Sequence, residues 1–253
     1  MYAPERQQAI LVAARAHGRV EVTALAESLR VTPETVRRDL TALERLGVVR
    51  RVHGGALPVE RLGVEPTLAT RREHFAAEKG RVAARAIEEL PEEGTVLLDA
   101  GTTTQAIAEL FPRDRELTVV TNSIAIASIL HGHPEIDLYV LGGRIRPRTG
   151  AAVGTWATSA LADVTVDVAF LGTNGFSVRR GMTTPDQAEA MAKRAMVAAS
   201  RRCVVVADSS KAELVHFHRF ALLDDVALLI TDRLLDEETA DRLEAEGLDT
   251  IRA

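Results

Sequence analysis

The sequence has one cysteine, few aromatic residues and no long apolar run. Aromatic side chains make up 4% of its 253 residues, and the single thiol, Cys203, excludes an internal disulfide. Because Cys203 directly precedes the apolar run 204–207, we expect a buried structural thiol. Unbroken apolar runs such as 226–230 fall far short of the roughly 20 residues that span a bilayer. The first ten residues are charged and lack the apolar core of a secretion signal, so we expect a cytoplasmic protein with no membrane partner.

The sequence also lacks several ligand-binding patterns. Neither GxGxxG nor GxxxxGK[ST] occurs, which argues against a dinucleotide sensor and against an NTPase. No cluster of histidine and cysteine has the spacing of metal ligands. The pairs His131/His133 and His216/His218 are expected to lie at the surface. We therefore expect neither a metal nor a cofactor.

Charge is divided unevenly along the chain. The formal net charge is −5, yet residues 1–57 hold nine arginines against six acidic residues, a net of +3 that leaves −8 for the remainder. A length of 253 residues suits one small domain and one of ordinary size. A basic small domain joined to an acidic larger one is typical of a regulator with a separate sensor.

The first 57 residues have the pattern of a helical domain with a β-wing. Apolar spacing predicts three helices, over residues 4–16, 23–29 and 33–46. Thr23 is expected to cap the second helix, while Thr32 and Pro33 suit the N-cap and first position of the third. Residues 48–55, which end in two glycines, predict a short two-stranded wing.

The two helices over 23–46, joined by a tight turn, have the form of a helix-turn-helix. The third helix would enter the major groove, and cations on the wing would meet the sugar–phosphate backbone. Arginine can hold a guanine by two hydrogen bonds or clamp a phosphate, and threonine can contact a thymine methyl group. The alternatives are a solvated helix face and a winged-helix module that binds protein. The predicted DNA-binding residues are Thr35, Arg37, Arg38, Arg50, Arg51 and His53.

Beyond a predicted linker at 58–74, residues 75–253 alternate apolar strands with helical segments. The strand candidates are 95–98, 117–120, 138–141, 166–171, 204–207 and 226–230. The helical segments include 105–110, 124–130, 186–200 and 236–246. Near-continuous apolar strands separated by helices predict an α/β domain with a mainly parallel sheet covered on both faces.

Each of the first five strand candidates leads into a polar loop with glycine or hydroxyl side chains. In open α/β sheets, ligands bind beyond the carboxyl ends of the strands. Small residues let the backbone approach, helix N-termini favour an anion, and basic side chains complete a phosphate site. One such loop alone is typical of an ordinary turn and helix cap. Five at one sheet edge indicate a polyhydroxylated, phosphorylated ligand.

Residues 31–56, VTPETVRRDLTALERLGVVRRVHGGA, resemble the signature of the DeoR family of bacterial repressors. The later runs LDAGTTT, VTNS, LGGRIR, FLGTNGF, GMTTPDQAEAMAKRAM and VADSSK resemble the sensor domain of that family. The resemblance implies a sensor similar in fold to ribose-phosphate isomerases, with a sugar phosphate as effector. It assigns effector binding to Asp99, Gly101, Thr102, Thr103, Thr104, Thr121, Asn122, Ser123, Gly142, Gly143, Arg144, Gly172, Thr173, Asn174, Gly175, Asp186, Glu189, Lys193 and Lys211. Glu189 and Lys193 are also spaced for a plain i,i+4 ion pair.

Two functions fit these residues. The first is a repressor that a sugar phosphate releases from a double-stranded DNA operator, whose two-fold symmetry favours a homodimer or homotetramer. The N-terminus and sensor resemble regulators of fructose use, which implies fructose 1-phosphate; glycerol 3-phosphate, deoxyribose 5-phosphate and tagatose- or galactose-derived phosphates are alternatives. The second is an active sugar-phosphate isomerase in which Asp186 or Glu189 moves a proton. The attached DNA-binding module favours the repressor, so we expect no enzyme.

Overall fold

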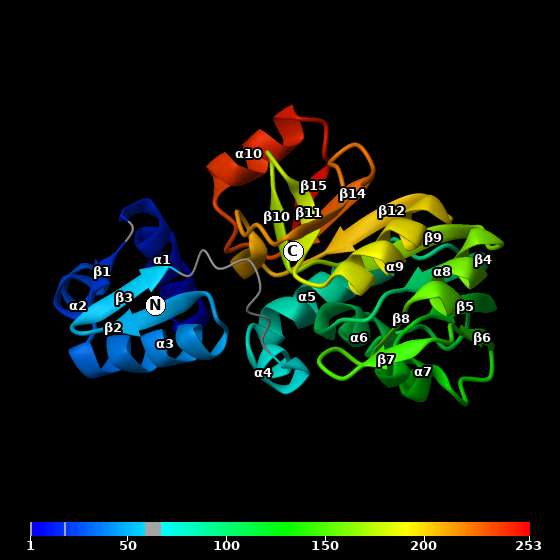
Figure 1. Cartoon of the computed structure of the whole chain (residues 1–253), viewed down its shortest axis with the longest axis horizontal. Coiled ribbons are helices and arrows are strands. Elements are labelled where there is room, and N and C mark those ends of the chain that lie inside the picture. Colours follow the sequence, from blue (N-terminus) through cyan, green and yellow to red (C-terminus); the bar gives the residue numbers. More distant parts are fainter. Residues whose placement is uncertain (1, 18, 59–66) are drawn as a thin grey trace. The chain divides into compact units, whose positions relative to one another are not determined.

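The computed structural model describes residues 2–17, 19–58 and 67–253. The chain divides into two compact units, Met1–Phe75 and Ala76–Ala253, which are described separately (Figure 1). The predicted linker at 58–74 holds more ordered structure than its sequence indicates. Pro58 is the last residue of a strand and Leu68–Glu73 form a helix, while 59–66 lie outside the described residues.

The described residues of the first unit form four helices and a small antiparallel sheet. Its helices are α1 (Ala3–His17), α2 (Val22–Leu29), α3 (Pro33–Arg45) and α4 (Leu68–Glu73). Its strands are β1 (Val20–Glu21), β2 (Val49–Val52) and β3 (Gly55–Pro58), in the order β1-β3-β2. Helix α2 begins at Val22 with Glu21 as N-cap, so the prediction that Thr23 caps it is wrong.

The wing has a third strand that the sequence did not predict. Strand β1 pairs with β3, with Val20 opposite Ala56, and ties the wing to the turn before α2. Two residues are too short to show a strand pattern, and this strand forms only because β3 is beside it. The β2–β3 turn contains Gly54 with a φ of 78°, a left-handed conformation that glycine adopts without strain.

The second unit is built on a seven-stranded, fully parallel sheet in the order β15-β14-β12-β9-β4-β5-β6. Its strands are β4 (Gly94–Leu98), β5 (Leu117–Thr121), β6 (Ile136–Val140), β9 (Val166–Gly172), β12 (Ser200–Val206), β14 (Leu228–Thr231) and β15 (Thr250–Arg252). All six strand candidates are found in this sheet. The seventh, β15, has too few apolar residues to be recognised from sequence.

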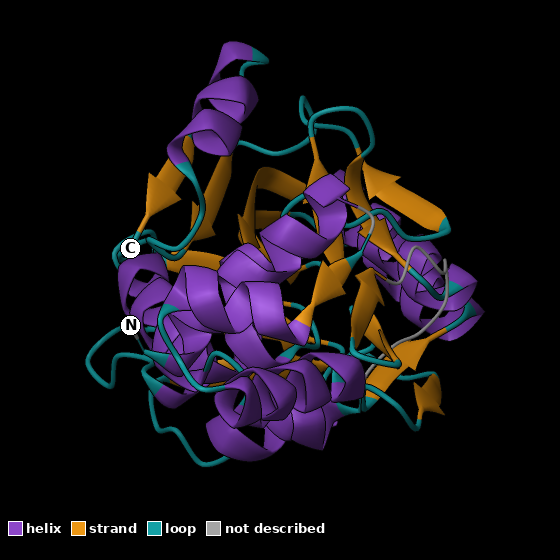
Figure 2. Cartoon of the chain, turned by 90° about the vertical axis from the view of Figure 1, so that its left-hand side faces the viewer, coloured by secondary structure: helices purple, strands orange, loops and turns teal. Residues whose placement is uncertain are grey.

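Helices cover both faces of the sheet. They are α5 (Ala76–Ile87), α6 (Thr102–Glu109), α7 (Ile124–Leu130), α8 (Thr155–Ala162), α9 (Gln187–Ala198) and α10 (Glu237–Ala245). Residues of α5, α6 and α7 join one buried apolar cluster, and residues of α8, α9 and α10 join another. Successive residues of β12 alternate between the two clusters, as the period of a strand requires. The predicted two-sided α/β sheet is therefore confirmed (Figure 2, helices purple and strands orange).

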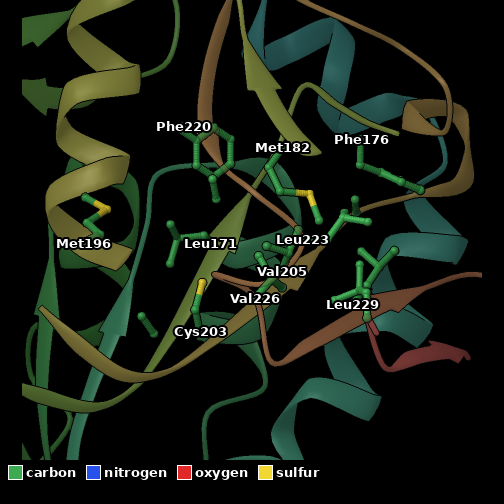
Figure 3. Close-up of a cluster of buried hydrophobic side chains, with 14 of the residues drawn as sticks. Leu171, Phe176, Met182, Met196, Cys203, Val205, Phe220, Leu223, Val226 and Leu229 are labelled. Carbon is green, nitrogen blue, oxygen red and sulfur yellow. The ribbon is translucent and has the colours of Figure 1, made fainter. Parts of the chain in front are cut away.

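The lone cysteine lies in one of these clusters. Cys203 of β12 is 4% exposed and packs among Leu171, Met196 and other apolar side chains (Figure 3). Burial raises the pKa of its thiol to about 12, so it remains uncharged near neutral pH. The prediction of a buried structural thiol is confirmed.

Two small β-structures extend beyond the main sheet. Strands β7 (Arg144–Arg146) and β8 (Ala151–Val153) form a hairpin, and β10 (Gly175–Ser177), β11 (Gly181–Thr184) and β13 (His218–Ala221) form a separate antiparallel sheet. A single 3-10 turn, η1 (Ser209–Lys211), follows β12. These strands are three or four residues long, and their pairing depends on contacts that are remote in sequence.

Candidate DNA-binding and effector sites

Helix α3 exposes a basic side. Thr32 caps the helix by accepting a hydrogen bond from the Thr35 amide at 3.2 Å, as its sequence predicts. Arg37 and Arg38 are both exposed, and Arg37 forms a solvent-exposed ion pair with Glu34 at 3.3 Å. An exposed pair of this kind is worth little, so a DNA phosphate or base can replace Glu34 as the partner of Arg37.

The acidic residues of α3 are held by other groups. Asp39 is buried, and its carboxylate accepts hydrogen bonds from Arg6 of α1, with the Nε–Oδ2 distance at 2.5 Å, and from Gln7 at 3.1 Å. Glu44 Oε1 accepts a hydrogen bond from the backbone amide of Arg51 at 2.9 Å. These acids tie the helix to α1 and to the wing, so they do not oppose the approach of DNA as free charges.

The wing carries the remaining predicted DNA contacts. Arg50, Arg51 and His53 are all exposed. The Arg51 guanidinium also donates a hydrogen bond to Thr41 of α3 at 3.1 Å, which links the wing to α3. Four of the predicted arginines and His53 are therefore exposed, Thr35 is half-buried, and DNA contact by these six residues stays a prediction.

Replacing an arginine of α3 should affect DNA binding differently from replacing an arginine of the wing. Arg38→Ala is expected to weaken binding to a specific operator by about 1–3 kcal/mol if the guanidinium holds a base edge. Arg51→Ala should weaken binding to all duplexes about equally and reduce the slope of log Kd against log salt by roughly one unit. Fluorescence anisotropy with specific and scrambled duplexes at several salt concentrations distinguishes the two effects. Unchanged affinities for both variants would contradict the assignment of this surface.

Two of the effector candidates, Asp99 and Gly172, lie where the order of the strands reverses. The chain runs outward from β4 through β5 to β6, and then returns to β9 on the other side of β4. Open α/β sheets bind ligands beyond the carboxyl ends of the strands at such a switch point. Asp99 follows β4 and Gly172 ends β9 at this switch point.

Lys193 joins the two strand ends. Its ammonium forms a buried ion pair with Asp99 and donates a hydrogen bond to the Gly172 carbonyl at 2.8 Å. Asp99 Oδ2 also accepts a hydrogen bond from the Gly172 amide at 3.1 Å. Burial raises the pKa of Asp99, and the opposing effect of the Lys193 ammonium does not cancel it. The alternative of a plain Glu189–Lys193 pair is wrong, because each residue pairs with a different partner.

Helix α6 begins beside Asp99 with three threonines. Thr102, Thr103 and Thr104 are buried, and the N-cap Gly101 provides no side chain to accept hydrogen bonds from their amides. A helix N-terminus with amides left over is suited to a phosphate or carboxylate, because the amides and the helix dipole both favour negative charge. This loop is the strongest candidate for holding the phosphate of an effector.

The predicted effector residues at the end of β5 and directly after it make hydrogen bonds within the chain. Thr121 donates a hydrogen bond from Oγ1 to the Leu98 carbonyl at 2.7 Å, and Ser123 caps α7. Asn122 accepts from the Ala100 amide at 3.0 Å and donates to the Ala152 carbonyl at 3.2 Å. Their buried side chains fix the position of the Gly101 loop. This outcome agrees with the ordinary turn-and-cap function of such residues.

The loop after β9 is also held by internal hydrogen bonds. Thr173 Oγ1 donates to the Gly175 carbonyl at 2.8 Å, and Asn174 Oδ1 accepts from Thr184 at 3.1 Å. At Gly175 any Cβ would lie 2.2 Å from the Leu214 carbonyl oxygen, so no other residue fits without a shift of the backbone. His216 contacts the Asn174 carbonyl at 3.1 Å through Nε2. Sequence reasoning placed this histidine at the surface, but it is half-buried against the candidate site.

A second network surrounds Glu189 at the other side of the site. Its carboxylate accepts hydrogen bonds from Thr149 at 2.5 Å and Arg146 at 3.1 Å, and from Thr184 at 3.3 Å. Arg146 also pairs with Asp186 at 3.0 Å. The Arg144 side chain proposed from sequence is exposed, so Arg146 is the arginine that reaches these acids. Gly142 and Gly143 form the turn between β6 and β7.

Neither acid is free to act as a base. Asp186 caps α9 by accepting the Glu189 amide at 3.0 Å. Although burial alone would raise the pKa of Asp186, the backbone amides and the Arg146 guanidinium lower it overall. A carboxylate with a lowered pKa is a weaker proton acceptor. The residues proposed for an isomerase reaction therefore have structural partners in place of a catalytic arrangement.

A further buried ion pair lies one strand away, after β12. Asp208 pairs with Lys79 of α5 at 3.0 Å, and both side chains are buried. The next strand end contributes Asp232, which accepts hydrogen bonds from the Ser209 amide at 2.7 Å and hydroxyl at 2.9 Å. Lys211 is half-buried at the end of this turn. Sequence reasoning found Lys211 but missed Lys79, although a helix that precedes the first strand begins at the same sheet edge.

No three histidine, cysteine or acidic side chains within the described ranges are grouped as metal ligands. Of the four histidines expected at the surface, His131 is exposed, whereas His133, His216 and His218 are half-buried. Among the helices of residues 2–17, 19–58 and 67–253, none has both the length and the apolar character of a bilayer span.

Both units match families of known proteins. Residues 6–61 match the DeoR-like helix-turn-helix domain, and residues 74–233 match the DeoR C terminal sensor domain. The chain belongs to the DeoR family. The resemblance drawn from residues 31–56 and from the strand-end loops is thus confirmed.

The DeoR-family relatives align over nearly the whole chain. The HTH-type transcriptional regulator GlpR of Haloferax volcanii is 39% identical over 230 residues, which cover 91% of this chain and 90% of the relative. The HTH-type transcriptional repressor GlcR of Bacillus subtilis is 32% identical over 252 residues, covering 99% of this chain and 96% of the relative. Because the relatives are regulators, the DeoR-family chain is a regulator and not an enzyme.

A solved structure of ribose 5-phosphate isomerase A from Methanocaldococcus jannaschii aligns with 55% of this chain and 55% of its own. The TM-score is 0.41 and the identity is 15%. This likeness is too distant to support any argument about the activity of the DeoR-family chain.

Proposed function

We propose that the chain represses a sugar-catabolism operon and leaves its operator when a phosphorylated sugar, fructose 1-phosphate, binds the second unit. The family establishes a transcriptional repressor with a sugar-phosphate sensor domain. The observation that supports the location of the effector site is the Lys193–Asp99–Gly172 arrangement at the strand-order switch point. Acceptors such as Asp99 and Glu189 suit sugar hydroxyls, and the α6 N-terminus suits the phosphate.

In this proposal the first unit binds DNA through α3 and the wing, and the second unit binds effector through the predicted strand-end residues. A DNA target places the protein in the cytoplasm. A two-fold symmetric operator would bind an even number of chains, as a dimer or a tetramer. The effector acts only if it binds the DNA-free state more tightly than the DNA-bound state.

A ligand screen tests the sensor half of the proposal. The panel contains fructose 1-phosphate, glycerol 3-phosphate, deoxyribose 5-phosphate and tagatose phosphates, with fructose and inorganic phosphate as controls. A ligand present at 100 times its Kd stabilises the folded chain by about 2.7 kcal/mol. For a domain of this size that corresponds to a rise in Tm of roughly 2–4 °C per kcal/mol. We expect such a rise for one phosphorylated sugar and none for free fructose; no shift with any member would contradict the proposal.

A further inference from the structure

We propose that the buried Lys79–Asp208 ion pair is the switch contact through which a bound effector changes DNA affinity. The inference rests on the proposed function, since it requires an anionic effector at the switch point. In the free chain Lys79 is held by Asp208; with effector bound, Lys79 turns to the anion and the first turn of α5 is released from the end of β12.

The pair lies beside the candidate site. Val206 of β12 is aligned with Gly172 of β9, and Asp208 follows two residues later at the same sheet edge. Neighbouring strands are about 4.8 Å apart, so the chain that leads to Asp208 leaves the sheet one strand away from Gly172, whose carbonyl Lys193 contacts. An anion above this edge would thus offer Lys79 a second partner of the same charge as Asp208.

The electrostatics favour two discrete arrangements over a gradual change. The Lys79 and Asp208 side chains are 7% and 2% exposed, with Nζ and Oδ2 3.0 Å apart. Burial works against the charged carboxylate, yet the ammonium groups of Lys79 and Lys211 hold the pKa of Asp208 below its usual range. Leaving a buried ammonium without a counter-charge is costly, so Lys79 can leave Asp208 only when another anion takes the place of that carboxylate.

Lys79 lies close in the sequence to the first unit. Lys79 is in the first turn of α5, which begins at Ala76, and the first unit ends at Phe75. Four peptide bonds thus separate Lys79 from Phe75, the last residue of the first unit. Arg81 lies on the same helix and pairs with Glu78 at 3.4 Å, but its side chain is 49% exposed. Because Arg81 is on the same helix but half-exposed, Arg81→Met is the matched control.

The test uses full-length chain, an operator duplex enriched from random-sequence DNA, and the sugar phosphate that raises the wild-type Tm. Calorimetry gives effector affinity, and anisotropy gives operator affinity without effector and at saturation. The ratio of the two operator affinities is the coupling, typically about 5- to 150-fold in allosteric proteins. The variants are Asp208→Asn, Lys79→Met and Arg81→Met.

The two switch variants should shift effector affinity in opposite directions. Asp208→Asn removes the competitor for Lys79, so the effector should bind about fivefold or more tightly, with lower operator affinity in its absence. Lys79→Met should weaken effector binding, and both variants should bring the coupling close to one. Arg81→Met should match wild type. If the pair is purely structural, both substitutions should shift effector affinity in the same direction, or the coupling should stay at its wild-type value. Either result overturns the inference.

Hydrogen exchange on the wild-type chain provides a test that needs no variant to fold. The amides of residues 80–83 donate to the carbonyls of the first turn of α5, and effector should reduce their protection more than that of the last turn. Unchanged exchange at residues 80–83, with an effector that binds and releases DNA, would overturn the switch contact alone. Binding by no member of the panel would overturn the proposed function and this inference with it.

Discussion

Lys193→Met is expected to produce a repressor that remains on its operator at effector concentrations that release the wild type. The substitution removes the ammonium that joins Asp99 to Gly172 at the switch point. Loss of a hydrogen bond to a charged group costs about 1.5–3 kcal/mol, which corresponds to roughly 10- to 150-fold in effector affinity. Operator affinity without effector should remain normal, because Lys193 lies outside the DNA-binding unit.

A second variant separates effector binding from stability. Lys193→Met alone leaves a buried carboxyl group without its cation, which should lower the free energy of unfolding by about 3–5 kcal/mol. Lys193→Met combined with Asp99→Asn removes both charges, and neutral groups of similar size should restore most of that stability. Effector affinity should remain low in the double variant. Arg194→Met, on the exposed side of the same helix, is the control.

Titration calorimetry measures effector affinity and thermal melts measure stability, for the wild type, Lys193→Met, the double variant and Arg194→Met. If the double variant regains both stability and effector affinity, Lys193 is only a structural partner of Asp99. If effector affinity is equal in all variants, the ligand lies elsewhere.

Asp39→Ala is expected to lower the free energy of unfolding of the first unit by about 3–5 kcal/mol, because it leaves the Arg6 guanidinium without its carboxylate. The Arg6 and Asp39 side chains are 12% and 4% exposed, so water cannot replace the lost partner fully. Small domains have only about 5–15 kcal/mol of stability, so the change is a large part of the total.

The control is Glu34→Ala on the same helix, whose pair with Arg37 is exposed. Exposed ion pairs contribute about 0–1 kcal/mol, so this variant should melt close to wild type. Hydrogen exchange of the amides of α1 and α3 reports the first unit separately from the second. Equal destabilisation by both substitutions would contradict the claim that the buried Arg6–Asp39 pair stabilises the first unit more than the exposed Glu34–Arg37 pair does.

Local signals were sufficient to predict much of the fold from sequence. The Thr32 cap and Pro33 start of α3 depend on residues within one turn, and they are found as predicted. The buried strands were recognised because each is a run of apolar residues. The gathering of polar loops at one edge followed from parallel pairing alone, since every parallel strand ends at the same side.

Pairings between remote residues could not be predicted in this way. Arg146 and Arg144 are equivalent in the sequence LGGRIR, and only the fold shows that Arg146 meets Glu189. Lys79 and Asp208 come together because α5 crosses the sheet to begin at the edge where β12 ends. Neither residue carries a local signal of its partner. The short strands β1 and β15 were missed for the same reason, since their hydrogen bonds come from distant segments.

Release of a labelled operator duplex by sugar phosphate tests the central claim most directly. Fluorescence anisotropy would measure operator Kd for the full chain at fixed salt, with rising fructose 1-phosphate and the other members of the panel. The account predicts that a phosphorylated sugar weakens operator binding by about 5- to 150-fold, and that the unphosphorylated sugar has no effect. An operator affinity unchanged by every sugar phosphate that binds the chain would contradict it.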